Sequence, residues 1–115
     1  MFMFTRYEKM ERTEQIKRHA EVSEKMIEGY LVQEVKALGG ICLKYSNPNM
    51  VGYPDRLVCL PGGRVAWVEL KSKGRKPTRI QNIRMSGLRD MGFEVHVADS
   101  REDIDRLTDY WLKLA

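Results

Sequence analysis

Cysteine and histidine are scarce in this sequence. Its 115 residues include two of each. Cys42 and Cys59 both lie in short apolar runs, where a free thiol packs as a small hydrophobic group, and they lack the spacing of a zinc site. Because the sequence also shows no secretory leader, these cysteines favour a reducing cytoplasm, which would be the host cytoplasm if the chain is viral.

Long hydrophobic runs are also missing. The opening Met1-Phe2-Met3-Phe4 is too short for the apolar core of a signal peptide, and no run approaches the roughly 20 residues of a membrane-spanning helix. We therefore expect no membrane partner. The sequence has no Gly-rich phosphate loop, nucleophile elbow or dinucleotide fingerprint. This absence weakens an assignment as a kinase, an ester hydrolase or a dehydrogenase. The length and a hydrophobic fraction of 43% suit one globular domain.

The apolar pattern predicts an α/β domain around a mixed sheet. A charged segment over residues 1–22, helical from about Tyr7 to Ala20, precedes a domain over residues 23–115. Ser23 is expected to cap a helix that ends near Gly39-Gly40. The further elements are strands at about 41–45, 56–60 and 65–71, a helix at 79–91, a strand at 93–98, and a final helix after Ser100 with Ile104, Leu107, Trp111 and Leu114 as its buried stripe.

Two acidic residues are predicted to meet across a hairpin. Pro61-Gly62-Gly63 supplies the backbone freedom of a tight reversal between two strands. If the reversal centres on Gly62, antiparallel pairing places Asp55 opposite Glu69. Because strand side chains alternate, Glu69 and Lys71 share one face. The sequence therefore brings two carboxylates and an ammonium group together.

This charge arrangement indicates a divalent-metal site. Two carboxylates about 4 Å apart repel by about 4 kcal/mol at an effective dielectric constant of about 20, so the pair calls for a cation. Oxygen ligands with room for water suit Mg²⁺ or Mn²⁺. Such an ion activates water and polarises a phosphoryl oxygen, while Lys71 orients the water or stabilises developing charge. A lone Glu-x-Lys is more typical of a solvent-facing strand, but the aligned Asp55 favours a site.

In order along the chain, these motifs resemble the PD-(D/E)xK nuclease superfamily, and within it the VRR-NUC group, the virus-type replication-repair nucleases. The resemblance covers most of the chain and rests mainly on Gly52-Tyr53-Pro54-Asp55, Glu69-Leu70-Lys71 and Gln81. It implies a restriction-endonuclease-like core, in which a mixed central sheet is flanked by helices. At Ser72-Lys73-Gly74 the chain departs from close relatives, which often carry a small residue and a proline before the glycine.

The resemblance also implies roles for individual residues. Asp55 and Glu69 would bind the metal together with the backbone carbonyl of Leu70, and Lys71 would be the catalytic lysine. Gln81 would lie at the edge of the active site. Its position in Thr78-x-x-Gln81 also matches a capping box, in which the glutamine side chain bonds the backbone of the cap, and both roles are compatible.

A glutamate in the first core helix is a further site residue implied by the resemblance. Glu28 fits this position best, and it adjoins the apolar stripe of the helix. That stripe consists of Ile27, Leu31, Val35 and Leu38. Surface solvation alone would also explain Glu28. Glu24, one turn earlier on a similar face, and Glu34 are the alternatives.

A cationic segment follows the proposed metal ligands directly. Its nine residues contain no acid and carry Lys71, Lys73, Arg75, Lys76 and Arg79. Lys44, Arg56 and Arg84 are expected near the same edge. Cationic side chains beside a metal site can contact the phosphates that flank a scissile one, so we expect nucleic-acid binding here. A solvated basic loop is the simpler alternative.

Together these features predict a metal-dependent endonuclease that hydrolyses DNA phosphodiester bonds. The resemblance implies a preference for structured or branched DNA, such as junctions. One chain carries one site, so symmetric cutting of two strands requires a homodimer, to which the charged N-terminal segment is a candidate contributor. The alternatives are a non-catalytic DNA-binding module with the same fold, or a restriction-type or RNA-directed nuclease.

Overall fold

The structure, a computed structural model, describes the backbone of residues 12–115 and the side chains of residues 24–115. The elements are α1 (Arg12–Ala37), β1 (Ile41–Lys44), β2 (Arg56–Leu60), β3 (Arg64–Leu70), α2 (Arg79–Asp90), β4 (Glu94–Ala98) and α3 (Arg101–Lys113). This order confirms the predicted mixed α/β class. From Ile41 onward the element ends agree with the prediction to within one residue.

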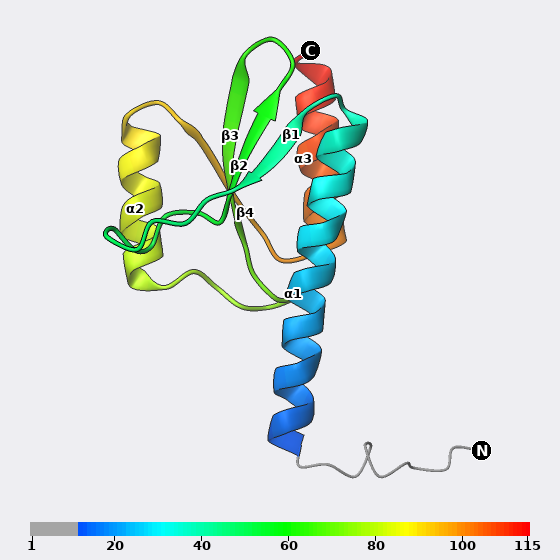
Figure 1. The fold of residues 1–115 in the computed structure, drawn as a ribbon, viewed down its shortest axis with the longest axis vertical. Coiled ribbons are helices and arrows are strands. Elements are labelled where there is room, and N and C mark those ends of the chain that lie inside the picture. Colours follow the sequence, from blue (N-terminus) through cyan, green and yellow to red (C-terminus); the bar gives the residue numbers. More distant parts are fainter. Residues whose placement is uncertain (1–11) are drawn as a thin grey trace, which may run out of the picture.

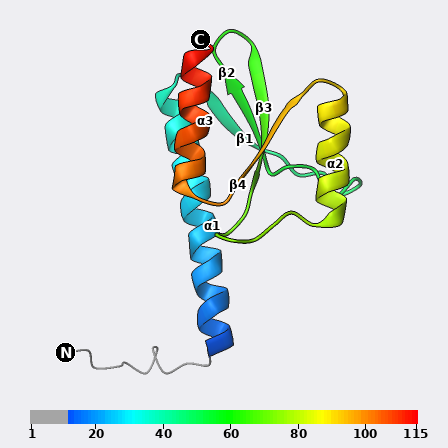
Figure 2. The same cartoon turned by 180° about the vertical axis from the view of Figure 1, so that it is seen from behind.

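The four strands form one sheet in the order β1-β2-β3-β4. The first three strands are antiparallel, and β4 runs parallel to β3. Parallel neighbours need a crossover connection, and α2 supplies it. Figures 1 and 2 show α1 and α3 together on one side of the sheet, with α2 alone on the other. The sheet is therefore covered on both faces.

Each face of the sheet has its own apolar core. The larger core lies under α1 and α3 and takes alternate residues of β3, namely Ala66, Val68 and Leu70. The smaller core lies under α2 and consists of Met85, Leu88 and Val95, with Tyr53 and Trp67 packed against it. The alternation along β3 thus sends Glu69, like Trp67, to the α2 side.

The β2–β3 hairpin has the predicted register. Arg56 pairs with Val68 and Leu60 with Arg64, so the reversal centres on residue 62. Gly62 and Gly63 both have positive φ, at 84° and 79°, which only glycine adopts readily. This turn chemistry fixes which residues at the far end of the hairpin face each other.

Two predicted helix features are wrong. Ser23 does not cap a helix, because it lies inside the uninterrupted α1, and the part of the predicted N-terminal helix before residue 12 is outside the described residues. Leu114 does not belong to the buried stripe of α3. It is 54% exposed, because the helix ends at Lys113, and Thr108 instead joins the buried residues.

The predicted starts of the later helices are confirmed, and each has a capping side chain. The Ser100 hydroxyl accepts a hydrogen bond from the Asp103 backbone N–H at the start of α3. Thr78 and Gln81 form both halves of a capping box at the start of α2. Among the described residues, no helix is long and apolar enough to cross a membrane.

Candidate active site

Asp55 and Glu69 meet at the open end of the β2–β3 hairpin. Asp55 directly precedes β2, and the pairing of Arg56 with Val68, extended by one residue, sets Asp55 opposite Glu69. The Asp55 backbone carbonyl accepts a hydrogen bond of 2.8 Å from the Tyr45 N–H, which holds this end of the strand in place. The predicted carboxylate pair is therefore present in the structure.

Glu69 is an acidic side chain in an almost fully buried position, with 1% of its surface exposed. Its Oε1 accepts a hydrogen bond of 3.4 Å from the Gln81 amide, whereas its Oε2 has no partner among the described residues. A buried carboxylate oxygen without a partner is costly, because it has lost water and gained nothing in return. The geometry leaves one strong acceptor available for a proton or a cation.

The environment of Glu69 raises its pKa to about 8. Burial is the largest cause, and the nearby Asp55 carboxylate adds to it. The Lys71 ammonium lowers the pKa, and the charge of Glu24 raises it further. In the absence of a cation, the fold therefore favours a protonated Glu69 at neutral pH.

Lys71 and Leu70 extend the site along β3. Leu70 is the last residue of the strand, and its side chain is buried in the larger core. The Lys71 N–H donates a hydrogen bond of 3.0 Å to the Ala98 carbonyl, so the chain stays attached to β4 one residue beyond the strand. This attachment keeps the half-buried Lys71 near the acid pair, as its effect on Glu69 requires.

Gln81 makes two contacts at once, the predicted capping box and a hydrogen bond to Glu69. Its Oε1 accepts a hydrogen bond of 2.9 Å from the Thr78 N–H, which completes the capping box. Its Nε2 donates to Glu69 Oε1. The two ends of one amide therefore join the first turn of α2 to the buried acid, and neither task excludes the other.

The three candidate glutamates of α1 have different surroundings. Glu28 forms an ion pair with Arg56, with 3.3 Å between Oε1 and Nη2. Glu24, one turn earlier and exposed, is the one whose charge raises the pKa of Glu69. The charge of Glu34 acts instead on Tyr30, whose hydroxyl donates a hydrogen bond to Asp105 of α3. The structure thus associates Glu24 with Glu69, and Glu28 with Arg56.

The predicted basic residues divide into two groups. Arg56 is largely buried and donates to the Cys42 carbonyl as well as pairing with Glu28. Arg84 donates to the Val51 carbonyl and lies over the Tyr53 ring. These two arginines bind other parts of the chain. The exposed members of the predicted set are Lys44, Lys73, Arg75, Lys76 and Arg79.

Sequence reasoning missed two contacts that support the site. One is the Glu28–Arg56 ion pair, which joins α1 to β2. The other is the hydrogen bond that the Gly74 N–H donates to the Asp99 carboxylate, which anchors the loop that carries Lys73, Arg75 and Lys76. Neither contact can be predicted from residue spacing in the sequence, because each depends on how separate elements pack together.

The donor set fits a hard divalent ion with few protein ligands. Within residues 24–115, no three side chains of His, Cys, Asp and Glu gather at metal-ligand spacing. The carboxylates of Asp55 and Glu69 do gather, and the unpartnered Glu69 Oε2 is an acceptor of the kind that such an ion requires. Mg²⁺ and Mn²⁺ suit two carboxylates, with the remaining positions filled by carbonyl oxygen or water.

Comparisons with known proteins point to one family. No protein-family profile matches the chain. The chain is 43% identical over 81 residues to "Putative nuclease p44" of Acyrthosiphon pisum secondary endosymbiont phage 1, which covers 70% of this chain and 87% of the relative. It also resembles a solved structure described as "VRR_NUC domain", with a TM-score of 0.73 and 32% identity over 77% of this chain and 97% of that one.

Proposed function

Since the chain belongs to the VRR-NUC nuclease family, we propose that it is an Mg²⁺- or Mn²⁺-dependent endonuclease that hydrolyses DNA phosphodiester bonds, with a preference for branched DNA. The observation that carries this proposal is the buried Glu69, which lies beside the half-buried Asp55 and has an unpartnered carboxylate oxygen. A buried acid held next to a second carboxylate costs stability, whereas the pair suits a cation-dependent reaction.

Asp55 and Glu69, with the Leu70 carbonyl, would hold the ion. When bound, the ion supplies electrophilic activation of the phosphate and a more acidic water. The chain's own part is to orient the two carboxylates. Register fixes Asp55, while burial and the Gln81 amide fix Glu69. This preorganisation lowers the entropic cost of assembling the site.

Lys71 is the proposed catalytic lysine. It lies close enough to Glu69 to lower the pKa of that acid, which supports a place for its ammonium group beside the bound phosphate. There it would orient the attacking water or stabilise negative charge that develops on the phosphate.

A helix-borne acid completes the proposed site. Glu24 and Glu28 are the two candidates. They lie on successive turns of α1, where the charge of Glu24 acts on Glu69 and Glu28 pairs with Arg56, the residue after Asp55. Glu24→Gln and Glu28→Gln separate them. The variant that weakens Mn²⁺ binding in calorimetric titration identifies the metal-site acid, and the other variant should bind Mn²⁺ as the wild type does.

DNA would bind over the exposed basic residues beside the acid pair. Lys73, Arg75 and Lys76 lie in one loop directly after the site, where they can contact the phosphates flanking the scissile one. A homodimer would supply the second active site that symmetric cutting of a junction requires. These features support DNA as the substrate and a second copy of the chain as the partner.

The decisive experiment compares a labelled four-way junction, a linear duplex, a single strand and RNA, each with Mg²⁺, Mn²⁺ or chelator. Junction cleavage with either ion and none in chelator is expected. Lys71→Ala should abolish cleavage while sparing DNA binding, and Lys36→Ala, a change of an exposed lysine in the last turn of α1, is the matched control. Cleavage in chelator would refute metal dependence, and binding of DNA without any cleavage would support a binding module.

A further inference from the structure

The loop from β3 to α2 carries three exposed basic residues, Lys73, Arg75 and Lys76, and begins with one defined turn. The Arg75 N–H donates a hydrogen bond of 2.9 Å to the Ser72 carbonyl, which closes a turn of four residues. Gly74, the third of them, has a φ of 81°, whereas the φ of Lys73 is not positive. These features define a type II β-turn.

The Asp99 carboxylate holds the central peptide of this turn. The N–H of that peptide belongs to Gly74 and donates a hydrogen bond of 3.1 Å to Asp99 Oδ2. In a type I turn the same peptide is rotated by roughly 180°, so its N–H points to the other side. The contact therefore selects the type II form. It forms at one end of the sheet, where the parallel strands β3 and β4 end together, with Leu70 paired to Ala98 (Figure 1).

Asp99 is itself held in place by the first turn of α3. Its backbone N–H donates a hydrogen bond of 3.0 Å to Asp103 Oδ2, and the Asp103 N–H donates to the Ser100 hydroxyl. Arg106 donates to the other carboxylate oxygen of Asp103. A continuous chain of contacts thus runs from α3 to the basic loop.

We propose that Asp99 is a positioning residue for DNA binding: by fixing the turn at Gly74, it presents Lys73 and Arg75 to the phosphates that flank the cleavage site. This inference rests on the proposed function. Among residues 24–115, Asp99 takes part in no ion pair, and its charge opposes phosphate binding. Its contribution therefore lies in the hydrogen bond. Without that bond the turn would change form, and DNA would have to order it on binding.

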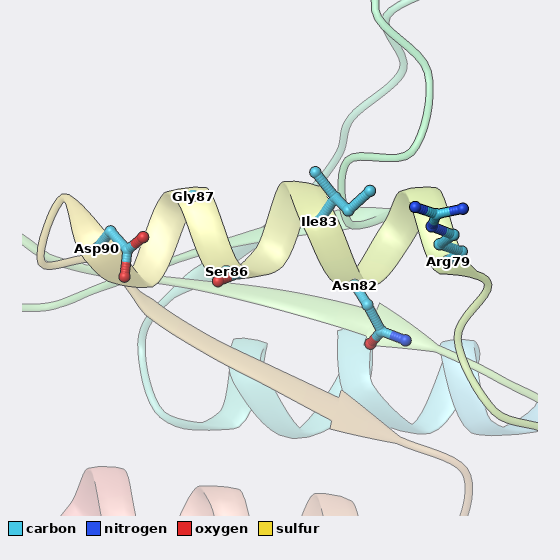
Figure 3. Close-up of a pocket in the computed structure, with 6 residues that line it drawn as sticks. All are labelled: Arg79, Asn82, Ile83, Ser86, Gly87 and Asp90. Carbon is cyan, nitrogen blue, oxygen red and sulfur yellow. The ribbon is translucent and has the colours of Figure 1, made fainter.

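Arg79 provides a comparison within the same molecule. It is the first residue of α2 and is exposed on the surface of that helix (Figure 3). The helix backbone fixes its position whatever the form of the turn. Loss of the Asp99 contact should therefore change the part that Arg75 plays in DNA binding and leave the part of Arg79 unchanged.

Two substitutions of Asp99 test the inference by anisotropy of a labelled four-way junction in chelator, at several salt concentrations. Simple electrostatics predicts that removal of an acid tightens DNA binding. Asp99→Ala should instead weaken binding about tenfold, because DNA must then order the turn. Asp99→Asn should bind at least as tightly as the wild type, since its side-chain oxygen still accepts the Gly74 hydrogen bond. Asp99→Ala should keep the wild-type salt slope, because the number of phosphate contacts is unchanged.

Three further readouts separate positioning from a general effect on folding. Hydrogen exchange of the Gly74 amide, followed by NMR spectroscopy without DNA, should lose protection in Asp99→Ala and keep it in Asp99→Asn. In cleavage assays, Asp99→Ala should raise KM for the junction with kcat close to that of the wild type. Its Mn²⁺ affinity in calorimetric titration should be unchanged. Asp109→Ala removes an exposed acid of α3 and, as the matched control, should bind DNA as the wild type does.

Double variants assign the effect to the loop. Arg75→Ala should cost less DNA affinity in the Asp99→Ala background than in the wild type, because the two residues act through one turn. Arg79→Ala should cost the same in both backgrounds. Equal costs for Arg75→Ala in the two backgrounds would contradict the proposal.

The outcomes distinguish this inference from the proposed function. If the wild type cleaves DNA but Asp99→Ala binds it as tightly, or if Asp99→Asn binds as weakly as Asp99→Ala, the positioning role is overturned and the nuclease stands. If Asp99→Ala alone loses DNA affinity but the wild type never cleaves, the nuclease is overturned and the positioning role stands. Parallel losses of Mn²⁺ and DNA binding in Asp99→Ala, or a wild type that binds no DNA, would overturn the positioning role.

Discussion

Replacing Glu69 by glutamine should stabilise the metal-free protein at neutral pH. The folded-state pKa of Glu69 is about 8 and the ordinary value is 4.5, so the folded state binds the proton more tightly than the unfolded state does. The stability that this group contributes is complete below pH 4.5 and is lost as the pH rises to about 8. Since glutamine cannot ionise, the variant avoids that loss.

The size of the effect follows from the shift. Each pKa unit corresponds to about 1.4 kcal/mol, so the wild type should lose about 3 kcal/mol between pH 4.5 and pH 7, and at most about 5 kcal/mol above pH 8. Glu69→Gln should remove most of this loss. Because a bound cation takes the place of the proton, Mn²⁺ should stabilise the wild type at pH 8 and have little effect on the variant.

Urea denaturation in chelator, at pH values from 5 to 9, measures the free energy of unfolding directly. Glu94→Gln is the matched control. Burial alone would raise the pKa of Glu94, but hydrogen bonds from Trp111, Arg64 and His96 outweigh burial and lower the pKa. The contribution of ionised Glu94 to folding stability is therefore lost only as the pH falls below 4.5, outside the range tested. A wild-type stability that does not change between pH 5 and 8, or a Glu69→Gln variant less stable than the wild type at pH 8, would refute the reasoning.

Three further predictions concern the site and its supports. Mn²⁺ affinity should rise up to about tenfold per pH unit between pH 6 and 8, because binding displaces one proton, and calorimetry at the two pH values checks this. Thr78→Ala should cost about 1 kcal/mol of stability with cleavage retained, whereas Gln81→Ala should lose both stability and cleavage; equal cleavage by the two variants would contradict the second role of Gln81. Arg56→Ala should lower the melting temperature because Glu28 loses its partner, yet it should leave the salt dependence of DNA binding unchanged. Arg75→Ala should reduce that dependence by about one unit of log–log slope, and identical slopes for the two variants would count against the assignment.

Local chemistry made the hairpin and the later helices predictable from the sequence. Two glycines in the turn and alternating strand residues were enough to set Asp55 opposite Glu69. The Thr78 capping box and the Ser100 cap were likewise visible as short-range patterns. In each case the contacts that decide the structure lie within a few residues of each other or across one tight turn.

Long-range packing explains what the sequence did not show. Ser23 is a good capping residue, yet the backbone continues through it as part of α1, because a serine does not by itself end a helix that is already formed on both sides. Glu28 best fitted the helix position that the family resemblance implies, but its partner Arg56 is 28 residues away on another element. Leu114 fitted the helical period, but α3 ends before it.

The shared use of Gln81 limits how this protein can be engineered. Glutamate at that position would serve the capping box equally well, but it would bring another negative charge to two carboxylates that already repel each other. A shorter or apolar residue would release both the helix start and the buried acid. Under the proposed function, thermostability and turnover are coupled at this one amide, and a more stable variant is better sought at helix ends that do not touch the acids.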